Sequence, residues 1–506
     1  MPQVIFEFIS KQKFIFTIIV LFVAVNAGFF YCFDFHFSIW YLLYALILEY
    51  IALGLIYEIV ELFYISVLPR CDPLRKEELT DYPNVALLCC TCDDVDSHVL
   101  TMLSRQNYPK LDVFVLDDSC SEECKAMVDS FCSPDIQVIR RNNRAGYKAG
   151  NLNNWLFQYG ESYQYFVVAD ADTILPYNFI EQMLCYAEHS ENTNIAIFES
   201  YIQAWNVKNR FARLQNVMVL VYNELKSRLE NRIGTTLSVG HNNLYRTHVI
   251  KELGGFSEKY VAEDYATSAQ LLKGRKWLCK TVPVVSYERL PENIAEYSRR
   301  QARWAFQTLQ LLDFDTSGLS LNLRLKLLMA IHHHVSRLVA LCGMIFLIIF
   351  SLSLGGFSLP SSIQEYEIFL LRSNILPFWV LLITTPLIIR MSLVLRQGIS
   401  LKDYITSMIF HSALFVATIW PVCRRLVNLA IGDRLGFNVT GVSPSPSVRQ
   451  IFYLGWPSFV LAWIVLFIVL FNSYISLINL LWLLPAVISP LVVYYYQRTP
   501  SKLSKI

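Results

Sequence analysis

Two aspartates that follow an apolar run offer the plainest chemistry in this chain. The run VVADADTILP at 167–176 leads into Asp170 and Asp172, with one residue between them. An apolar run of this kind predicts a buried strand, and ligands of α/β sheets bind beyond the carboxyl ends of strands. Two carboxylates at that place can hold a hard divalent cation, which in turn holds a diphosphate. The alternative is an ordinary strand-to-loop turn.

Two other apolar runs also end in pairs of aspartates. The run VALLCC leads to Asp93 and Asp94, and the run VFVL leads to Asp117 and Asp118. Three strands that each end in acids favour a ligand site over three unrelated turns.

A lysine between glycines lies among these acidic strand ends. In the stretch RRNNRAGYKAGNLNN at 140–154, Lys148 stands between Gly146 and Gly150. A lysine near a Gly-rich turn is suited to phosphate binding as a point charge. The alternative is a solvated turn.

Two later stretches add groups for a substrate hydroxyl. VGHNNLYR contains His241 and Asn242, and GGFSEKYVAEDYATSAQLL puts Glu263 and Asp264 at the start of an expected helix. A carboxylate there can accept a proton from a substrate hydroxyl. It can equally serve only the electrostatics of the helix N-terminus.

The amphipathic stretch EYSRRQARWAFQTLQLL at 296–312 carries a basic and aromatic group. Its residues Arg299, Arg300, Arg303 and Trp304 combine cations that neutralise diphosphate with a ring that stacks on sugars. The alternative is an interfacial helix whose arginines meet lipid head groups.

The composition indicates a membrane protein around this chemistry. The chain has 506 residues, of which 54% are hydrophobic and only 17% are charged, with a formal net charge of +2. That balance is too apolar for an ordinary soluble enzyme, and the net charge gives no sign of nucleic-acid binding. Segments of about 20 apolar residues can cross a bilayer. The expected spans are 13–32, 40–66, 331–354, 374–395, 452–472 and 476–497.

Between the second and third spans the pattern changes to that of an α/β domain. From 70 to 325, short apolar runs alternate with helical patterns, which predicts a mostly parallel sheet. We interpret 404–431 as an interfacial or re-entrant helix, and the alternative is a seventh span. The basic tail, 498–506, is expected to be cytosolic. Six spans then place both termini and the α/β domain in the cytosol.

Two clusters of possible metal ligands have simpler interpretations. Cys89, Cys90 and Cys92 are expected to be small buried residues in a reduced compartment, because no paired ligands follow for zinc. The three histidines 332–334 are expected at a membrane interface, since adjacent histidines on a helix point in different directions. A metal site is the alternative for each cluster.

In order and spacing, these motifs resemble those of the membrane-embedded family 2 glycosyltransferases, which include cellulose, chitin and hyaluronan synthases. The resemblance covers roughly 80 to 450. It rests on a strand-end acid pair, a DxD motif, an acid pair that follows threonine in the family, and a Q-x-x-R-W motif. Here these are Asp117–Asp118, Asp170–Asp172, Glu263–Asp264 and Arg300–Trp304.

The chain departs from the family pattern in three places. Arg300 stands where the family has glutamine, and Ala262 replaces the threonine before the acid pair. The stretch GFNVTGV (436–442) resembles the gating-loop motif of cellulose synthases, with Val442 at its lysine position. The loop motif favours a glucan synthase, and its alternative is a chance match in a linker.

The resemblance implies a GT-A-type α/β domain inserted in an α-helical transmembrane bundle of about six spans plus interfacial helices. It implies Asp264 as the general base with Glu263 beside it, and Mg²⁺ or Mn²⁺ on Asp170 and Asp172. The implied UDP-binding residues are Thr91, Asp93, Asp94, Asp117, Asp118, Lys148, Asp170, Arg300 and Arg303. The implied acceptor-binding residues are Trp304, His241 and Asn242, and the gating-loop residues are Phe437, Val439 and Thr440.

The activity that this implies is processive, inverting synthesis of a β-glucan, capsular or cellulose-like, from UDP-glucose. The polymer would leave through the protein's own membrane channel. The alternatives are a hyaluronan- or chitin-type synthase with another UDP-sugar, a lipid glycosyltransferase, and a transporter or binding protein without catalysis. We expect no cyclic-di-GMP domain. The expected divisions are 1–69 (two spans), 70–325 (catalytic), 326–400 (two spans), 401–450 (interfacial helix and gating loop) and 451–506 (two spans and tail).

Overall fold

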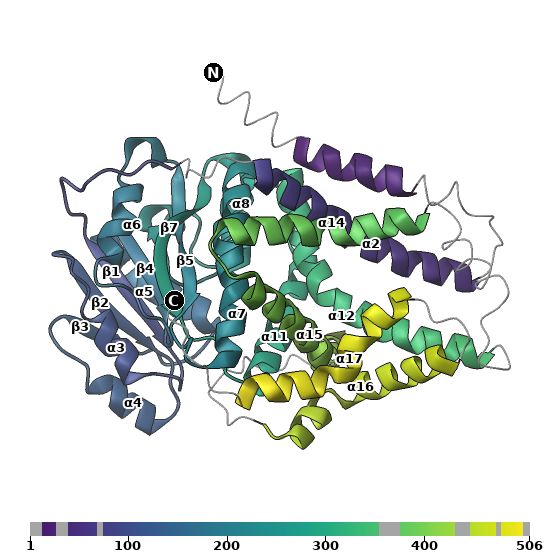
Figure 1. Cartoon of the computed structure of the whole chain (residues 1–506). Coiled ribbons are helices and arrows are strands. Elements are labelled where there is room, and N and C mark those ends of the chain that lie inside the picture. Colours follow the sequence, from purple (N-terminus) through teal and green to yellow (C-terminus); the bar gives the residue numbers. More distant parts are fainter. Residues whose placement is uncertain are drawn as a thin grey trace.

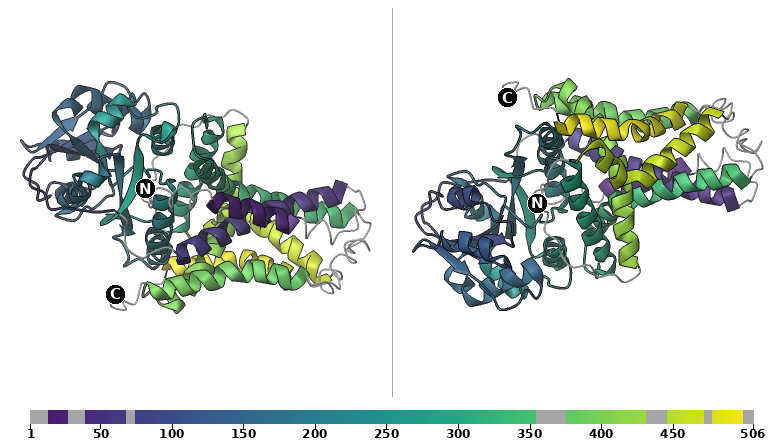
Figure 2. Two further views of the ribbon diagram at one scale, coloured as in Figure 1. Left: turned by 90° about the horizontal axis from the view of Figure 1, so that it is seen from above. Right: turned by 90° about the horizontal axis from the view of Figure 1, so that it is seen from below.

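The molecule consists of a sheet domain at one end and a bundle of long helices at the other (Figure 1). Views from above and below show the same division (Figure 2). The computed structural model describes residues 13–26, 39–67, 74–353, 375–430, 446–471 and 477–498.

Seven strands form one sheet in the order β3-β2-β1-β4-β6-β5-β7. Strand β1 pairs in parallel with β2 on one side and β4 on the other, and β6 is antiparallel to both of its neighbours. The mostly parallel α/β domain is therefore confirmed, with one antiparallel strand that the sequence pattern did not predict. The strands are β1 (Val85–Thr91), β2 (Leu111–Asp117), β3 (Ile136–Ile139), β4 (Tyr165–Asp170), β5 (Ile195–Ala204), β6 (Asn243–Arg246) and β7 (Leu278–Glu288).

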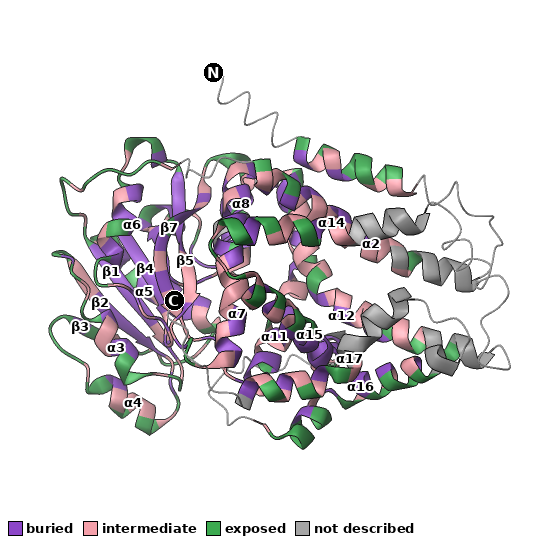
Figure 3. Cartoon of the chain, viewed as in Figure 1, coloured by how far each residue is buried: buried purple, intermediate pink, exposed green. Residues whose placement is uncertain are grey.

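Strand β1 is buried on both faces, which explains its unbroken apolar sequence. Val85 and Leu87 belong to the core on one face, and Ala86 and Leu88 belong to the core on the other. Figure 3 shows the central strands as the buried interior of this domain. The covering and connecting helices are α3 (Ser97–Leu103), α4 (Glu122–Asp129), α5 (Tyr147–Gln158), α6 (Phe179–Ala187), α8 (Ser227–Ile233), α9 (Thr247–Glu252) and α10 (Glu263–Leu271).

The register of the central strands brings three acidic strand ends together. Thr91 at the end of β1 is opposite Asp117 of β2, and Cys90 is opposite Asp170 of β4. The chain moves to one side of β1 for β2 and to the other side for β4, so this edge is a topological switch point. The three loops therefore meet at the place where such sheets bind ligands.

In the part of the chain that the structure describes, four helices are long and apolar enough to cross a membrane. One of them, Leu401–Asn428, is the segment that we expected to lie in the interface, so length and composition do not decide between the two interpretations. The six-span topology stays a prediction. The long helices are α2 (Ile39–Val67), α12 (Leu321–Ser353), α14 (Ile375–Arg396), α15 (Leu401–Ala430), α16 (Val448–Phe471) and α17 (Leu477–Arg498).

Two helices, α7 (Arg210–Val221) and α11 (Ile294–Gln310), lie between the sheet and the bundle (Figure 1). Phe211 of α7 packs edge-on against Phe410 of α15, with ring centroids 4.8 Å apart. Ile294 of α11 belongs to the same apolar core. The amphipathic helix expected over 296–312 is thus confirmed, and one of its faces is packed against other helices.

Candidate active site

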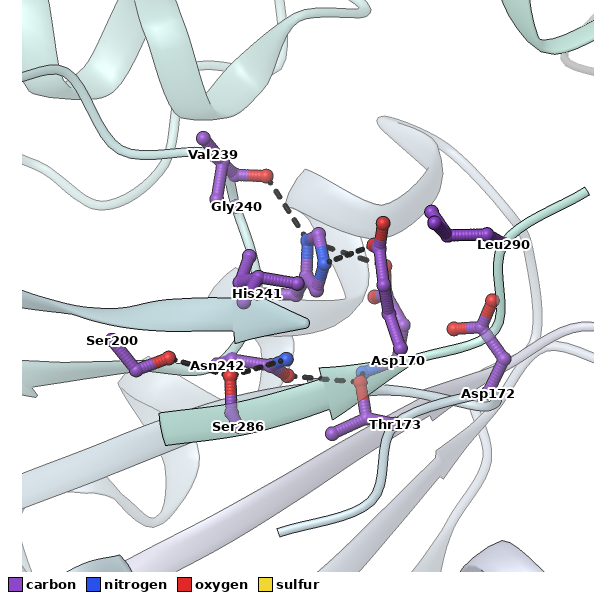
Figure 4. A network of polar contacts seen from close by, with 12 residues as sticks. Asp170, Asp172, Thr173, Ser200, Val239, Gly240, His241, Asn242, Ser286 and Leu290 are labelled. Carbon is purple, nitrogen blue, oxygen red and sulfur yellow. Dashed lines mark hydrogen bonds and ion pairs between the residues drawn. The ribbon is translucent and has the colours of Figure 1, made fainter. Parts of the chain in front are cut away.

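A row of alternating charges, formed by Lys148, Asp170, His241 and Glu288, lies at the carboxyl edge of the sheet. Figure 4 shows His241 beside Asp170 in this row. Lys148 at the start of α5 places its Nζ 2.5 Å from Asp170 Oδ1 and donates to Gly240 O at 3.0 Å. His241 Nδ1 lies 3.8 Å from Asp170 Oδ2, and His241 Nε2 lies 3.0 Å from Glu288 Oε2. Glu288 ends β7 and His241 precedes β6, so two strands, one helix and one loop contribute to the row.

The neighbours in this row fix each other's charge. Burial by itself disfavours the carboxylate of Asp170, but the nearby charges of Lys148 and His241 outweigh it and lower its pKa. Burial alone would lower the pKa of His241, and the carboxylates of Asp170 and Glu288 instead raise it to about 9. His241 is therefore a cation at neutral pH.

Asp172 differs from its partner in the DxD motif. Its side chain makes no hydrogen bond or ion pair with any residue that the structure describes, whereas Asp170 is closely paired. Figure 4 shows both carboxylates projecting to the same side of the strand end. Burial, together with the charges of Asp170 and Glu288, raises the pKa of Asp172 to about 7. A half-buried carboxylate without a paired cation is the chemistry that a hard divalent ion satisfies, so Asp172 fits a metal ligand.

Glu263 and Asp264 lie beside this row, at the first turn of α10. A Cβ added to Gly240 would lie 2.9 Å from Asp264 Oδ2, so the carboxylate packs against the residue whose carbonyl binds Lys148. Burial and the charge of Asp264 raise the pKa of Glu263 to about 7, and burial raises the pKa of Asp264. A role limited to the helix N-terminus would lower these pKa values, so the direction of the shift favours a proton acceptor.

Helix α11 brings its basic residues to the same place. Arg300 Nη1 lies 3.6 Å from Glu288 Oε1, and the Arg300 guanidinium lies 4.7 Å from the centroid of the Trp304 ring. Burial lowers the pKa of Arg303, while the charge of Asp170 opposes that shift. Trp304 is 39% exposed, so its ring is open to a ligand while its neighbours are held.

The loop after β1 is held together by its own aspartates. Asp93 Oδ1 accepts hydrogen bonds from the backbone N–H groups of Cys120 and Ser121, at 2.9 and 2.8 Å. Asp94 Oδ1 accepts from Thr91 Oγ1 at 3.1 Å and from a backbone N–H at 2.7 Å. These bonds join the loops after β1 and β2 into one surface.

The acid pair after β2 is neutralised within the chain. Arg140 Nε donates to Asp117 Oδ2 at 2.7 Å. Arg141 binds both carboxylate oxygens of Asp118, at 2.8 and 2.6 Å, and both side chains are almost buried. The two arginines belong to the stretch in which only Lys148 was expected to take part.

Comparison with known proteins identifies the family. Residues 46–387, more than half of the chain, match glycosyl transferase family 21. The chain belongs to glycosyl transferase family 21. The match does not show the resemblance to the cellulose synthases of family 2, which stays a prediction.

Relatives of this family 21 glycosyltransferase include glucans biosynthesis glucosyltransferase H of Salmonella typhi and of Escherichia coli K12. Each is 25% identical over 344 residues, which cover 61% of this chain and 38% of the relative. The chain thus matches well under half the length of these relatives. A solved mannosyltransferase from Pyrobaculum calidifontis, in complex with GDP-Man and Mn²⁺, is 17% identical, with a TM-score of 0.49 and coverage of 70% of this chain and 99% of that one. Because that TM-score is below 0.5, the family assignment rests on the sequence match.

In this family 21 glycosyltransferase, two residues expected to bind the acceptor have their side chains engaged by other residues of the chain. Asn242 is completely buried. Its side-chain oxygen accepts a hydrogen bond from Thr173 Oγ1 at 2.9 Å, and its side-chain nitrogen donates to Ser286 Oγ at 3.0 Å. We therefore reassign Asn242 to the scaffold. His241 lies between Asp170 and Glu288 and therefore belongs to the row of alternating charges.

Sequence reasoning missed Glu288, which links His241 to Arg300. Its signal was present, because the apolar run TVPVVSYE ends in an acid just as the runs before Asp117 and Asp170 do. The gating-loop residues Phe437, Val439 and Thr440 lie outside the described residues, so their expected role stays a prediction.

Proposed function

We propose that this family 21 glycosyltransferase transfers glucose from UDP-glucose to a hydroxyl group of a growing glucan, with inversion, at the cell membrane. The observation that carries the proposal is the contact between Asp264 and Gly240, whose carbonyl binds Lys148. It puts a carboxylate with a raised pKa next to a lysine suited to diphosphate. The glucan-synthesis names of the relatives support glucose as the sugar.

The diphosphate would lie against the cations of this edge. Lys148, Arg300 and Arg303 supply positive charge, and the loops after β1 and β2 would enclose the uridine. Asp172, together with Asp170, would hold Mg²⁺ or Mn²⁺. Such an ion, when bound, stabilises negative charge on departing UDP.

The chain's own residues then account for the transfer. The carboxylate of Asp264 takes the proton from the acceptor hydroxyl as its oxygen forms a bond to the anomeric carbon of glucose. The bond from that carbon to the UDP oxygen breaks in the same step, and Arg303 stabilises the charge that develops. A single in-line displacement inverts the configuration, so an α-linked donor gives a β-linked product.

The acceptor end supports a membrane-coupled reaction. The ring of Trp304 is exposed and stacks under Arg300, so it offers a platform for a terminal sugar. Helix α11, which carries it, packs against the bundle that would form the exit channel. We propose processive synthesis and secretion on this arrangement, with a cytosolic catalytic domain, a multi-pass bundle and the gating loop (436–442) beyond α15.

The test is an incubation of purified, detergent-solubilised protein with radiolabelled UDP-sugars and Mg²⁺ or Mn²⁺. We expect a high-mass product from UDP-glucose alone that β-glucan hydrolases degrade. A product from UDP-N-acetylglucosamine instead would favour the chitin- or hyaluronan-type alternative. Label found only in a small lipid-soluble product would replace the polymerase proposal with a lipid glycosyltransferase.

A further inference from the structure

Two opposite faces of helix α11 make different contacts. Residues three and four positions apart lie on the same face. Arg300, Arg303 and Trp304 form the face toward the row of alternating charges at the sheet edge. Ser298, Gln301 and Ala305 form the other face and are at most 5% exposed. The position of the first face relative to the sheet therefore depends on what holds the second.

The second face is held by an arginine of the bundle. Arg337 of α12 donates from Nη2 to Gln301 Oε1 at 3.1 Å and from Nε to Thr418 Oγ1 of α15 at 3.2 Å. Its guanidinium lies 5.0 Å from the centroid of the Phe415 ring, and the residue is 2% exposed. One planar group thus joins α11, α12 and α15.

The stability of the bundle does not account for this arrangement. Among the ion pairs of the described residues, Arg337 has no carboxylate partner, and its acceptors are an amide, a hydroxyl and the carbonyl of His333. Moving a guanidinium out of water costs several kcal/mol, which neutral acceptors offset only in part. The guanidinium instead fixes the relative position of its acceptors, because its planar fork holds two of them in one plane.

The C-terminal end of α11 contacts the loop that precedes the expected base, Asp264. Gln307 Nε2 donates to Val261 O at 3.2 Å, and Val261 N–H donates to Gln310 Oε1 at 2.9 Å. Val261 is two residues before Glu263. A shift of α11 would therefore move Arg303 and the base loop together.

We propose that Arg337 is a positioning residue, through which the membrane bundle sets the place of α11 and, with it, of the diphosphate-binding arginines and the base loop. The proposal rests on the proposed function for its catalytic consequence only. The geometry of the Arg337–Gln301 contact stands without it.

The experiment compares R337M with R390M in the full-length protein. Arg390 of α14 pairs with Glu58 of α2, so R390M also removes a half-buried cation from the bundle but leaves α11 untouched. We expect R337M to raise the KM for UDP-glucose at least tenfold, because it would misplace the arginines of α11 that are proposed to bind the diphosphate. We also expect backbone amide exchange in 294–310 to be at least about fivefold faster in R337M, and unchanged in R390M.

Two further variants keep the test decisive if R337M does not fold. R337K retains the charge but not the fork, and Q301A removes the acceptor on α11; both should raise the KM, and the Q301A/R337K pair should be non-additive. If R337K and Q301A showed the same KM for UDP-glucose and the same amide exchange in 294–310 as R390M, Arg337 would not be a positioning residue. If the wild-type protein uses no nucleotide sugar, the proposed function fails, while amide exchange still decides the role of Arg337.

Discussion

Two groups of carboxylates lie at one edge of the sheet, and their surroundings are opposite. Asp93 and Asp118, in the loops after β1 and β2, are closed by backbone N–H groups or by an arginine of the same chain. Asp172, Glu263 and Asp264 are half-buried, and desolvation raises their pKa values. The first group builds loops, and the second is prepared for a proton or a metal ion.

The difference comes from where the cations lie. Arg140 and Arg141 reach back to the acids after β2. Near the second group, Lys148 is committed to Asp170, whose carboxylate it meets at 2.5 Å. Among the residues that the structure describes, Asp172, Glu263 and Asp264 form no ion pair, and carboxylates with such perturbed pKa values cluster at functional sites.

The largest effect is expected from D264N. The amide keeps the shape of the side chain but cannot accept the acceptor's proton, so kcat should fall about a thousandfold, within the usual contribution of a general base. Binding of UDP, measured by calorimetry, should be unchanged. E263Q is the matched control and should lose far less. Retention of full turnover by D264N would move the base to another residue.

A smaller loss of turnover is expected from D172N. Removing this carboxylate should weaken Mn²⁺ binding in the presence of UDP at least a hundredfold, which a titration with the paramagnetic ion measures. The same change removes a charge from beside Asp170 and Glu288, so Tm at pH 8 without metal should not fall. Unchanged Mn²⁺ affinity would remove Asp172 from the metal site.

The pH profile should show activity and stability moving in opposite directions. Burial raises the pKa of Glu263 to about 7 and also raises that of Asp264, so the pair takes up protons as the pH falls, and kcat/KM should fall by up to about tenfold per pH unit. The folded pKa of Glu263 exceeds its ordinary 4.5, so the folded state binds the proton more tightly than the unfolded state. The stability that Glu263 contributes is therefore full below about pH 4.5 and is lost as the pH rises to about 7. A profile flat from pH 5 to 8 would contradict the assignment.

The edge of the sheet could be predicted because its signals are local. Apolar runs that end in acids marked the strands before Asp94, Asp117 and Asp170, and the parallel sheet brought those ends together. The separate roles of Asp170 and Asp172 could not be predicted. They depend on Lys148 and His241, which reach the site from 22 and 71 residues away.

The bundle was predicted less completely, for a related reason. Hydrophobicity marks a long apolar helix but does not say whether it crosses a bilayer or packs beneath it, as the segment Leu401–Asn428 illustrates. Arg337 gave no signal in the sequence, because a single arginine in an apolar run has no partner until α11 and α15 are brought beside it.

The smallest effect on turnover, and the clearest on stability, is expected from D118N. The change leaves Arg141 almost buried without its carboxylate, and breaking such a pair costs about 3–5 kcal/mol. Tm should therefore fall by several degrees, while kcat at a temperature where the protein stays folded should change less than about threefold. D129N breaks the exposed pair of Asp129 with Arg140 and should change stability by at most about 1 kcal/mol. If D118N abolished turnover in protein that stays folded, Asp118 would belong with Asp172 and Asp264, and the division between loop-building and reactive carboxylates would have to be redrawn.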